Sequence, residues 1–351
     1  MKLFIPGPVN VDPEILKALS TPVIGHRTEE FHQLFATLQA KLQKLLFTEN
    51  RIILPTSSAT GLWEACILNC VEKSILHLVN GSFSSKWHEV SLACGRQADK
   101  LEAEWGKAVK PEMVEKALRE KQYEAIAITH NETSTGVMNP LEEILEAAHR
   151  HGVMTFVDAV SSMAGVRIDV DRLGIDVCLA SVQKAFGLPP GFAMASVSER
   201  AFEKSRKMRN KGYYFDFSAL LKYMEKSETP STPSIPHMFA LDKQLDRMFA
   251  EGLENRFARH LEMAMLMRTW ASEHFALFPE KGYESVTMTC IKNTKNISVS
   301  NLINELRKRG MVISNGYGPL MEKTFRIAHM ADLQVKDIQE LLGNMEDILK
   351  L

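Results

Sequence analysis

Hydrophobic positions recur along the first fifty residues with the spacing of helices. Asp12 followed by Pro13 is typical of a helix cap and first turn. From Thr28 to about Phe47, leucines and phenylalanines then return every three or four residues. This pattern predicts a short helix followed by a longer amphipathic one.

The chain beyond residue 50 alternates between short apolar runs and helical patterns. Apolar runs of four or five residues, bounded by polar or turn residues, indicate buried strands, whereas stretches such as 111–121 and 140–151 have helical spacing. This alternation predicts an α/β fold with a mostly parallel sheet and helices on both faces. The predicted strands are Arg51 to Leu54, Ile75 to Val79, Ala125 to Thr129, Val153 to Val157, Val177 to Ala180 and Ala193 to Val197.

The pattern changes after about Ser227. Three prolines, Pro230, Pro233 and Pro236, punctuate a stretch rich in serine and threonine, which predicts an extended surface loop. A long helical pattern over 241–275 follows, and then strands near 286–291 and 324–329, a helix near 299–309 and a last helix from about residue 335. We therefore expect a large domain over residues 1–250 and a small C-terminal α+β domain over residues 251–351.

Composition narrows the class of protein. At about 150 residues per domain, 351 residues favour two domains. The formal net charge is -1, which disfavours binding to nucleic acid over the whole surface, and the basic run at 204–211 is typical of a solvated helix face. No segment has the length of a membrane span. Five scattered cysteines, an odd number, indicate a reduced, cytoplasmic protein without a metal site.

Candidate chemistry follows the strands, because ligands of open α/β sheets bind at the carboxyl ends of the strands. The turn at 55–61 is rich in hydroxyls and precedes a helix, so its free N–H groups, with Ser58 and Thr60, could hold a phosphate or simply cap the helix. The cluster at 129–136 is a dense polar loop, which indicates either a functional loop or a solvated turn.

Two opposite charges follow neighbouring strands. Asp158 ends one apolar run and Lys184 follows the next. The pair could form a salt bridge, or the lysine could lose its proton through desolvation and attack carbonyls as a nucleophile, forming a Schiff base. A phosphate-binding turn, a lysine and an acid at adjacent strand ends together describe a pocket for pyridoxal 5'-phosphate (PLP). Phe83 could stack on its ring or belong to the core.

The sequence resembles the class V aminotransferases, in the branch of the alanine–glyoxylate and serine–pyruvate enzymes. The resemblance covers nearly the whole chain. It implies a PLP-dependent transferase of fold type I, with the cofactor in the large domain and an N-terminal segment near the substrate. The segments that carry it are FIPGPVNV (4–11), GHRTEEF (25–31), HNETSTG (130–136), VDAVS (157–161) and SVQKAFGLPPG (181–191).

The resemblance also implies a role for each matching residue. Lys184 would form the Schiff base and carry the proton, and Asp158 would pair with the pyridinium. Arg326 would clamp the substrate α-carboxylate, with His26 and Arg27 as further substrate candidates. Cofactor contacts are implied for Ser58, Ala59, Thr60, Phe83, Thr133 and Gln183, and for Thr232 through a neighbouring subunit, which implies a homodimer with shared sites.

Some residues depart from the family pattern. Ser57 and Ala59 replace the usual glycines of the phosphate turn, and Thr229 stands where relatives often carry a tyrosine. The resemblance favours alanine or serine as amino donor and glyoxylate or pyruvate as acceptor. Phosphoserine aminotransferase is the main alternative, and the less favoured ones are a cysteine desulfurase and a non-catalytic protein of the same fold.

Overall fold

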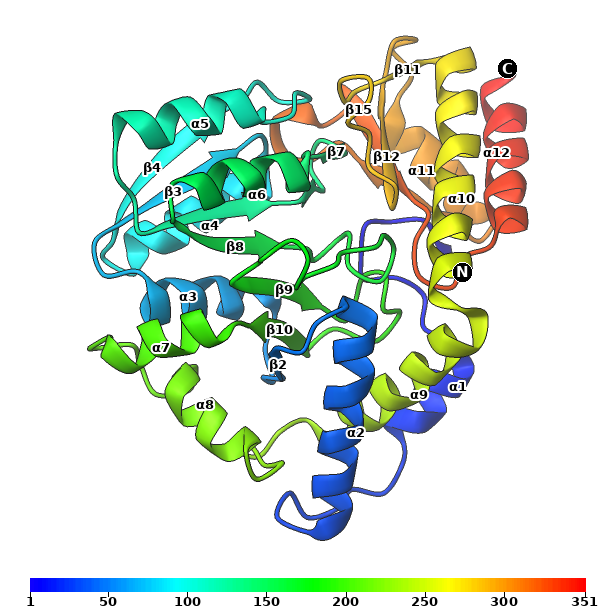
Figure 1. Ribbon diagram of the computed structural model, residues 1–351. Coiled ribbons are helices and arrows are strands. Elements are labelled where there is room, and N and C mark those ends of the chain that lie inside the picture. The colour runs from blue at the N-terminus through cyan, green and yellow to red at the C-terminus, as the bar shows by residue number, and fades with distance from the viewer.

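The computed structural model describes residues 1–351, and its largest element is a sheet of seven strands (Figure 1). The strand order is β2-β10-β9-β8-β5-β3-β4. Neighbouring strands are parallel except around β10, which runs antiparallel to β2 and to β9. The predicted mostly parallel sheet is therefore confirmed. Its strands are β2 (Arg51–Ile53), β3 (Ser74–Val79), β4 (Gln97–Glu102), β5 (Ala125–Thr129), β8 (Met154–Asp158), β9 (Val177–Ser181) and β10 (Ala193–Val197).

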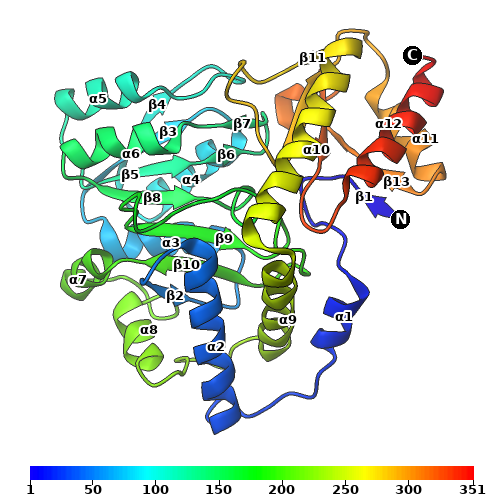
Figure 2. The same cartoon turned by 45° about the vertical axis from the view of Figure 1, so that its right-hand side comes forward.

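The central strands are apolar because both faces of the sheet are covered. Every residue of β5, β8, β9 and β10 is buried, and Figures 1 and 2 show helices on both sides of the sheet. The helices of this part of the chain are α1 (Pro13–Leu19), α2 (Glu29–Leu46), α3 (Ala59–Cys70), α4 (Ser82–Ala93), α5 (Pro111–Glu120), α6 (Leu141–Arg150), α7 (Glu199–Lys207), α8 (Phe217–Met224) and α9 (Ile235–Glu251).

One strand of the large sheet does not follow the buried pattern. The edge strand β4 has the sequence QADKLE, and none of its residues is fully buried. An edge strand has one neighbour and an open face, so it does not need an apolar run. The apolar-run criterion therefore misses it.

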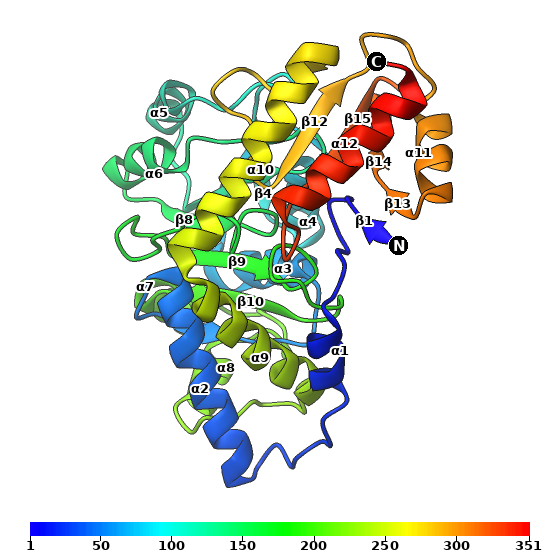
Figure 3. The same ribbon diagram turned by 90° about the vertical axis from the view of Figure 1, so that its right-hand side faces the viewer.

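A second, smaller sheet lies in the C-terminal part of the chain. Its order is β11-β12-β15-β14, and Figure 3 shows α10 and α12 side by side over β12 and β15. The N-terminal strand β1 pairs in parallel with β13, and Phe4 joins the smaller hydrophobic core. The elements are β1 (Lys2–Leu3), α10 (Leu253–His274), β11 (Ala276–Leu277), β12 (Met288–Lys292), α11 (Val299–Lys308), β13 (Met311–Val312), β14 (Ser314–Asn315), a 3-10 turn (Gly318–Leu320), β15 (Thr324–Ala328) and α12 (Val335–Leu349); a separate hairpin joins β6 (Asn131–Glu132) and β7 (Val137–Met138).

The long helix expected over 241–275 is two helices. Gly252 has a φ of 86°, a conformation that favours glycine, and it separates α9 from α10. Pro236 lies in the first turn of α9, where a missing N–H costs nothing, so the proline-rich loop ends two residues earlier than expected. The apolar spacing continues across the start of α9 and across the break between α9 and α10. Spacing alone therefore did not locate these two boundaries.

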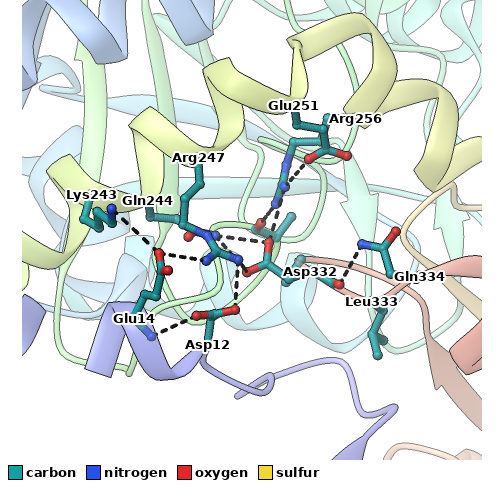
Figure 4. Close-up of polar contacts among 12 residues, drawn as sticks. Asp12, Glu14, Lys243, Gln244, Arg247, Glu251, Arg256, Asp332, Leu333 and Gln334 are labelled. Carbon is teal, nitrogen blue, oxygen red and sulfur yellow. Dashed lines mark hydrogen bonds and ion pairs between the residues drawn. The ribbon is translucent and has the colours of Figure 1, made fainter. Parts of the chain in front are cut away.

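A buried arginine connects the small sheet's last loop to the large part of the molecule. Arg256 of α10 donates to the carbonyl oxygens of Ala164 at 3.0 Å and Ala185 at 2.7 Å. Its Nη1 lies 3.0 Å from Glu251 and 3.5 Å from Asp332. Figure 4 shows Arg256 with Glu251 and Asp332, and Asp332 lies between Arg256 and Arg247. One guanidinium thus ties together segments from four places in the chain.

The second arginine of this network extends it to the N-terminal helix. Arg247 of α9 donates to Asp12 at 2.9 Å and to Glu14 at 3.3 Å, and lies 3.5 Å from Asp332 (Figure 4). Asp12 also caps α1 by accepting from the N–H of Glu14. The network therefore holds α1, α9 and the loop after β15 in one arrangement.

We expect Arg256→Met to lower the free energy of unfolding by about 3 kcal/mol, because it leaves the carbonyls of Ala164 and Ala185 without their donor and removes a buried cation beside Glu251 and Asp332. A urea titration followed by circular dichroism measures this. Arg307→Met, on the exposed face of α11, is the control and should change stability by less than about 0.5 kcal/mol. Equal stability of the two variants would contradict the structural role given to Arg256.

No helix of this chain has both the length and the apolar character required to cross a membrane.

Candidate active site

Three neighbouring strands bring the predicted polar residues to one edge of the large sheet. Strands β5, β8 and β9 are parallel neighbours, and Thr129 pairs in register with Asp158. Asp158 is the last residue of β8, and Lys184 follows the end of β9 by three residues. The two residues that the sequence analysis singled out as acid and nucleophile therefore lie at adjacent strand ends.

Asp158 is a buried carboxylate with no cation beside it. Its side chain accepts from the indole N–H of Trp63 at 2.9 Å and from the backbone N–H of Val160 at 2.8 Å. Neither donor is a lysine or an arginine, and the residue is 4% exposed. Burial raises the pKa of Asp158 to about 7. A cationic N–H from a ligand would satisfy this carboxylate.

Lys184 lies close to the N-terminal loop. Its Nζ donates to the carbonyl oxygen of Pro6, and a Cβ on Gly7 would come within 2.7 Å of its side chain. Burial, and then the charge of Arg326, lower the pKa of Lys184 to about 8, while the charge of Asp158 acts in the opposite direction. Lys184 and Asp158 form no ion pair, so the salt-bridge alternative is not present in this structure. An amine with this pKa is partly unprotonated near neutral pH.

Arg326 lies in the interior of the small sheet, between β12 and β14. It is 8% exposed and donates only to backbone carbonyls, those of Thr133 at 3.1 Å and Asn315 at 3.2 Å. Its guanidinium carbon lies 5.3 Å from the ring centroid of Tyr317, and burial lowers the pKa of Arg326. A buried guanidinium without a carboxylate partner is suited to an anionic ligand.

A buried glutamate holds the start of helix α4, which carries Phe83. Glu132 is fully buried and accepts the backbone N–H groups of Phe83 at 3.3 Å and Ser84 at 2.9 Å, so it caps the start of α4. The Phe83 ring lies 5.4 Å from that of Tyr317. Phe83 is only partly buried, so one side of the ring remains available for stacking.

The hydroxyl-rich turn leaves the start of helix α3 open. Ser58 is the N-cap residue but makes no side-chain hydrogen bond to the helix, and both Ser58 and Thr60 are exposed. The Ser57 hydroxyl donates to the Ser58 carbonyl at 2.9 Å, while Ala59 is buried against the core. The plain capping alternative is thus not present here, and the free N–H groups of this turn suit a phosphate.

Two further predicted cofactor residues lie nearby with partners of their own. The Thr133 hydroxyl is 2.8 Å from the hydroxyl of Ser161, in the loop that follows Asp158. Gln183 accepts from the hydroxyl of Ser181 and remains partly exposed. Thr133 therefore contacts the loop that follows Asp158, and Gln183 is the residue before Lys184.

Three predicted residues lie away from this group within the chain. His26 and Arg27 precede α2, where Arg27 lies 3.7 Å from Glu228 and 5.5 Å from the ring of Tyr223. Thr232 is exposed in the loop between α8 and α9. None of the three forms a hydrogen bond or an ion pair with Lys184 within one chain.

The loop that carries Thr232 borders the phosphate turn of its own chain. The backbone N–H of Ser234 donates to the Thr56 hydroxyl at 2.9 Å. Thr229, which replaces the family tyrosine, is buried there, and its hydroxyl has no partner. This loop and the phosphate turn therefore form one surface.

The sequence analysis did not identify Trp63, Glu132 or Tyr317 as functional residues. Glu132 lies in the polar cluster at 129–136 that was recognised as a candidate loop, so its position carried a signal. Trp63 is inside an apolar helix, and Tyr317 lies in the loop before β15, far along the chain from Phe83 and Lys184. Their roles depend on contacts across the fold, which no local pattern reports.

The residues of this site fit PLP. An uncompensated carboxylate suits a pyridinium N–H, a half-buried phenylalanine suits the ring, an amine of lowered pKa suits the aldehyde, and an open helix start suits the phosphate.

Comparison with known proteins agrees with this chemistry. The family model described as aminotransferase class-V matches residues 16–341. The chain belongs to the class V aminotransferases. It is therefore a PLP-dependent transaminase of fold type I.

Curated relatives match over nearly their full length. An aminotransferase of Methanocaldococcus jannaschii is 37% identical over 99% of this chain and 92% of its own. The serine–glyoxylate aminotransferase of Methylorubrum extorquens is 31% identical over 94% of this chain and 86% of its own.

Solved structures superimpose closely. The alanine–glyoxylate aminotransferase of Nostoc has a TM-score of 0.93 at 27% identity, covering 99% of this chain and 94% of its own. A phosphoserine aminotransferase of Cytophaga hutchinsonii has a TM-score of 0.90 at 30% identity, covering 99% and 98%.

The raised pKa of Asp158 predicts that the free energy of unfolding of the cofactor-free protein depends on pH. An unfolded Asp titrates near 3.8, so between that pH and about 7 the folded state binds more protons, and stability falls as pH rises. Asp158→Asn removes this titration. The stability of the variant relative to the unmodified protein should therefore increase from pH 4 to 7 and then level off.

Urea titrations of both cofactor-free proteins at several pH values measure this difference. A constant offset reflects the altered hydrogen bonds to Trp63 and Val160, and only the pH dependence reports the titration. A difference that is flat across this range would contradict the raised pKa.

Proposed function

We propose that this enzyme transfers the amino group of a small L-amino acid, alanine or serine, to a 2-oxo acid such as glyoxylate or pyruvate. The observation that carries the proposal is Arg326, a buried cation that has no carboxylate partner of its own and lies near Lys184. Paired N–H groups of an arginine suit the α-carboxylate that all amino and 2-oxo acids share. The similarity to serine–glyoxylate and alanine–glyoxylate aminotransferases supports this choice of substrates.

Residues that follow several strands of the large sheet would hold the cofactor. Asp158 would accept the ring N–H and Phe83 would stack on the ring, and Asp158 is already held in position by Trp63 and Val160. When bound, PLP supplies an electron sink for the electron pair released at the substrate α-carbon. The remaining cofactor contacts would come from Ser58, Ala59, Thr60, Thr133 and Gln183.

Lys184 would do two tasks. Its amine would hold the cofactor through the aldehyde group, and in its unprotonated form it would accept the proton of the substrate α-carbon. Burial lowers the pKa of Lys184 to about 8, which makes both the nucleophilic and the proton-carrying forms accessible near neutral pH. Arg326 would orient the substrate so that the α-carbon faces this amine.

Phosphoserine aminotransferase is the second candidate. The structure from Cytophaga hutchinsonii supports it through its likeness to this chain. A cysteine desulfurase is less favoured, because Phe83 and Gln183 stand where that chemistry expects histidines. A non-catalytic protein is disfavoured by the intact Lys184 and Asp158.

We expect Lys184→Ala to remove the visible absorbance of lysine-bound cofactor and to lower turnover by roughly 1,000-fold or more. The measurement mixes the PLP form with single amino acids and records which ones bleach that absorbance. Alanine or serine should bleach the unmodified enzyme rapidly, and Lys116→Ala, on exposed helix α5, should behave in the same way. Bleaching by phosphoserine alone would favour the second candidate, and unchanged absorbance in Lys184→Ala would contradict the role of Lys184.

We further propose a homodimer with shared sites, in which Thr232 reaches the cofactor phosphate of the partner chain and His26 and Arg27 approach its substrate. The position of these residues away from Lys184, in exposed segments, supports this arrangement. Sedimentation velocity should give a species of twice the 39.5 kDa chain mass. A fully active species of single-chain mass would contradict the proposal.

A further inference from the structure

Lys86 is an exposed residue of α4, one helical turn beyond Phe83. Both residues are on α4, and residues three apart share a helix face. The Lys86 Nζ donates to the hydroxyl of Tyr317 at 2.9 Å and lies 5.6 Å from the centroid of the Phe83 ring. The ammonium is therefore held on the same aromatic pair that borders the candidate cofactor space.

Tyr317 connects this ammonium to the arginine of the site. The Arg326 guanidinium carbon is 5.3 Å from the Tyr317 ring centroid, and the Lys86 Nζ is 5.4 Å from it. Since Lys86 is hydrogen-bonded to the hydroxyl, it lies at that end of the ring. The two cations therefore share one tyrosine.

Neither cation has a carboxylate within 4 Å. Lys86 has Tyr317 as its hydrogen-bond partner, and Arg326 has two backbone carbonyls. Other lysines beside the large sheet are paired, for example Lys204 with Glu124 at 2.8 Å and Lys110 with Glu280 at 3.0 Å. Two unpaired positive charges beside one ring form a site for two anionic groups on one small molecule.

We propose that Lys86 binds an anionic group on the substrate side chain while Arg326 holds the α-carboxylate. The proposal rests on the transaminase function above and names a substrate class for it. Lys86 then improves the binding of amino acids whose short side chain ends in a carboxylate or a phosphate, compared with the same site without Lys86. Alanine and serine remain donors, because their α-carboxylate contact does not involve Lys86.

The test compares matched donors in the half-reaction of the holoenzyme. The kcat/KM ratios for aspartate over asparagine and for phosphoserine over serine are measured in the unmodified enzyme, Lys86→Met and Lys86→Arg. A hydrogen-bonded charge pair predicts a fall of at least about tenfold in one or both ratios for Lys86→Met. Lys86→Arg keeps the charge and should retain most of the preference, and Lys116→Met is the control.

An equilibrium measurement separates binding from turnover. Titration calorimetry on the holoenzyme gives the Kd of succinate, which has two carboxylates, and of propionate, which has one. The succinate Kd should rise about tenfold in Lys86→Met, and the propionate Kd should not change. Lys86 is exposed, so these variants should fold normally.

The two kcat/KM ratios distinguish a side-chain carboxylate from a side-chain phosphate as the group that Lys86 binds. A loss in the aspartate ratio assigns a carboxylate, and a loss in the phosphoserine ratio assigns a phosphate. Unchanged ratios and an unchanged succinate Kd would overturn the proposal while leaving the transaminase intact. If no amino acid bleached the cofactor, the proposed function would fail, and the succinate titration would still decide whether Lys86 binds an anion.

Discussion

The carboxylate of Asp158 is buried without a cation, and the arrangement of the site depends on this constraint. Two neutral N–H groups, from Trp63 and Val160, are its only protein donors, and burial raises its pKa to about 7. A large apolar sheet offsets the cost of keeping it there. The folded chain therefore retains a carboxylate that a cationic N–H of a ligand would suit better than its own neutral donors. Such groups are expected at binding sites, where function lowers the stability of the protein.

Positive charges on the other side of the site are also without protein partners. Arg326 is buried on backbone carbonyls, and Lys86 rests on a tyrosine hydroxyl. Because Lys184 lies near both Arg326 and Asp158, its pKa reflects a balance between their opposite charges and its own burial. The same electrostatic arrangement thus lowers the pKa of Lys184 and leaves Arg326 and Lys86 without a carboxylate partner.

The active site lies where the two hydrophobic cores meet. Lys184 and Asp158 belong to the large sheet, whereas Arg326 belongs to the small one, and its bond to Thr133 crosses between them. Arg256 supports this junction, since it bonds the carbonyl of Ala185, the residue after Lys184, and the carboxylate of Asp332. The relative position of Lys184 and Arg326 is therefore set by contacts between the two parts.

The sequence alone determined six of the seven strands of the large sheet and the residues at their ends. A strand covered on both faces must be apolar, so the polar residues that follow β8 and β9, Asp158 and Lys184, stood out. Tertiary structure decided the edge strand β4, because this strand has no apolar run. It also decided the break at Gly252, because the apolar spacing of the helical pattern continues across it. It also decided the contact between Lys86 and Tyr317, which joins residues 231 positions apart, and no local periodicity reports a contact across that separation.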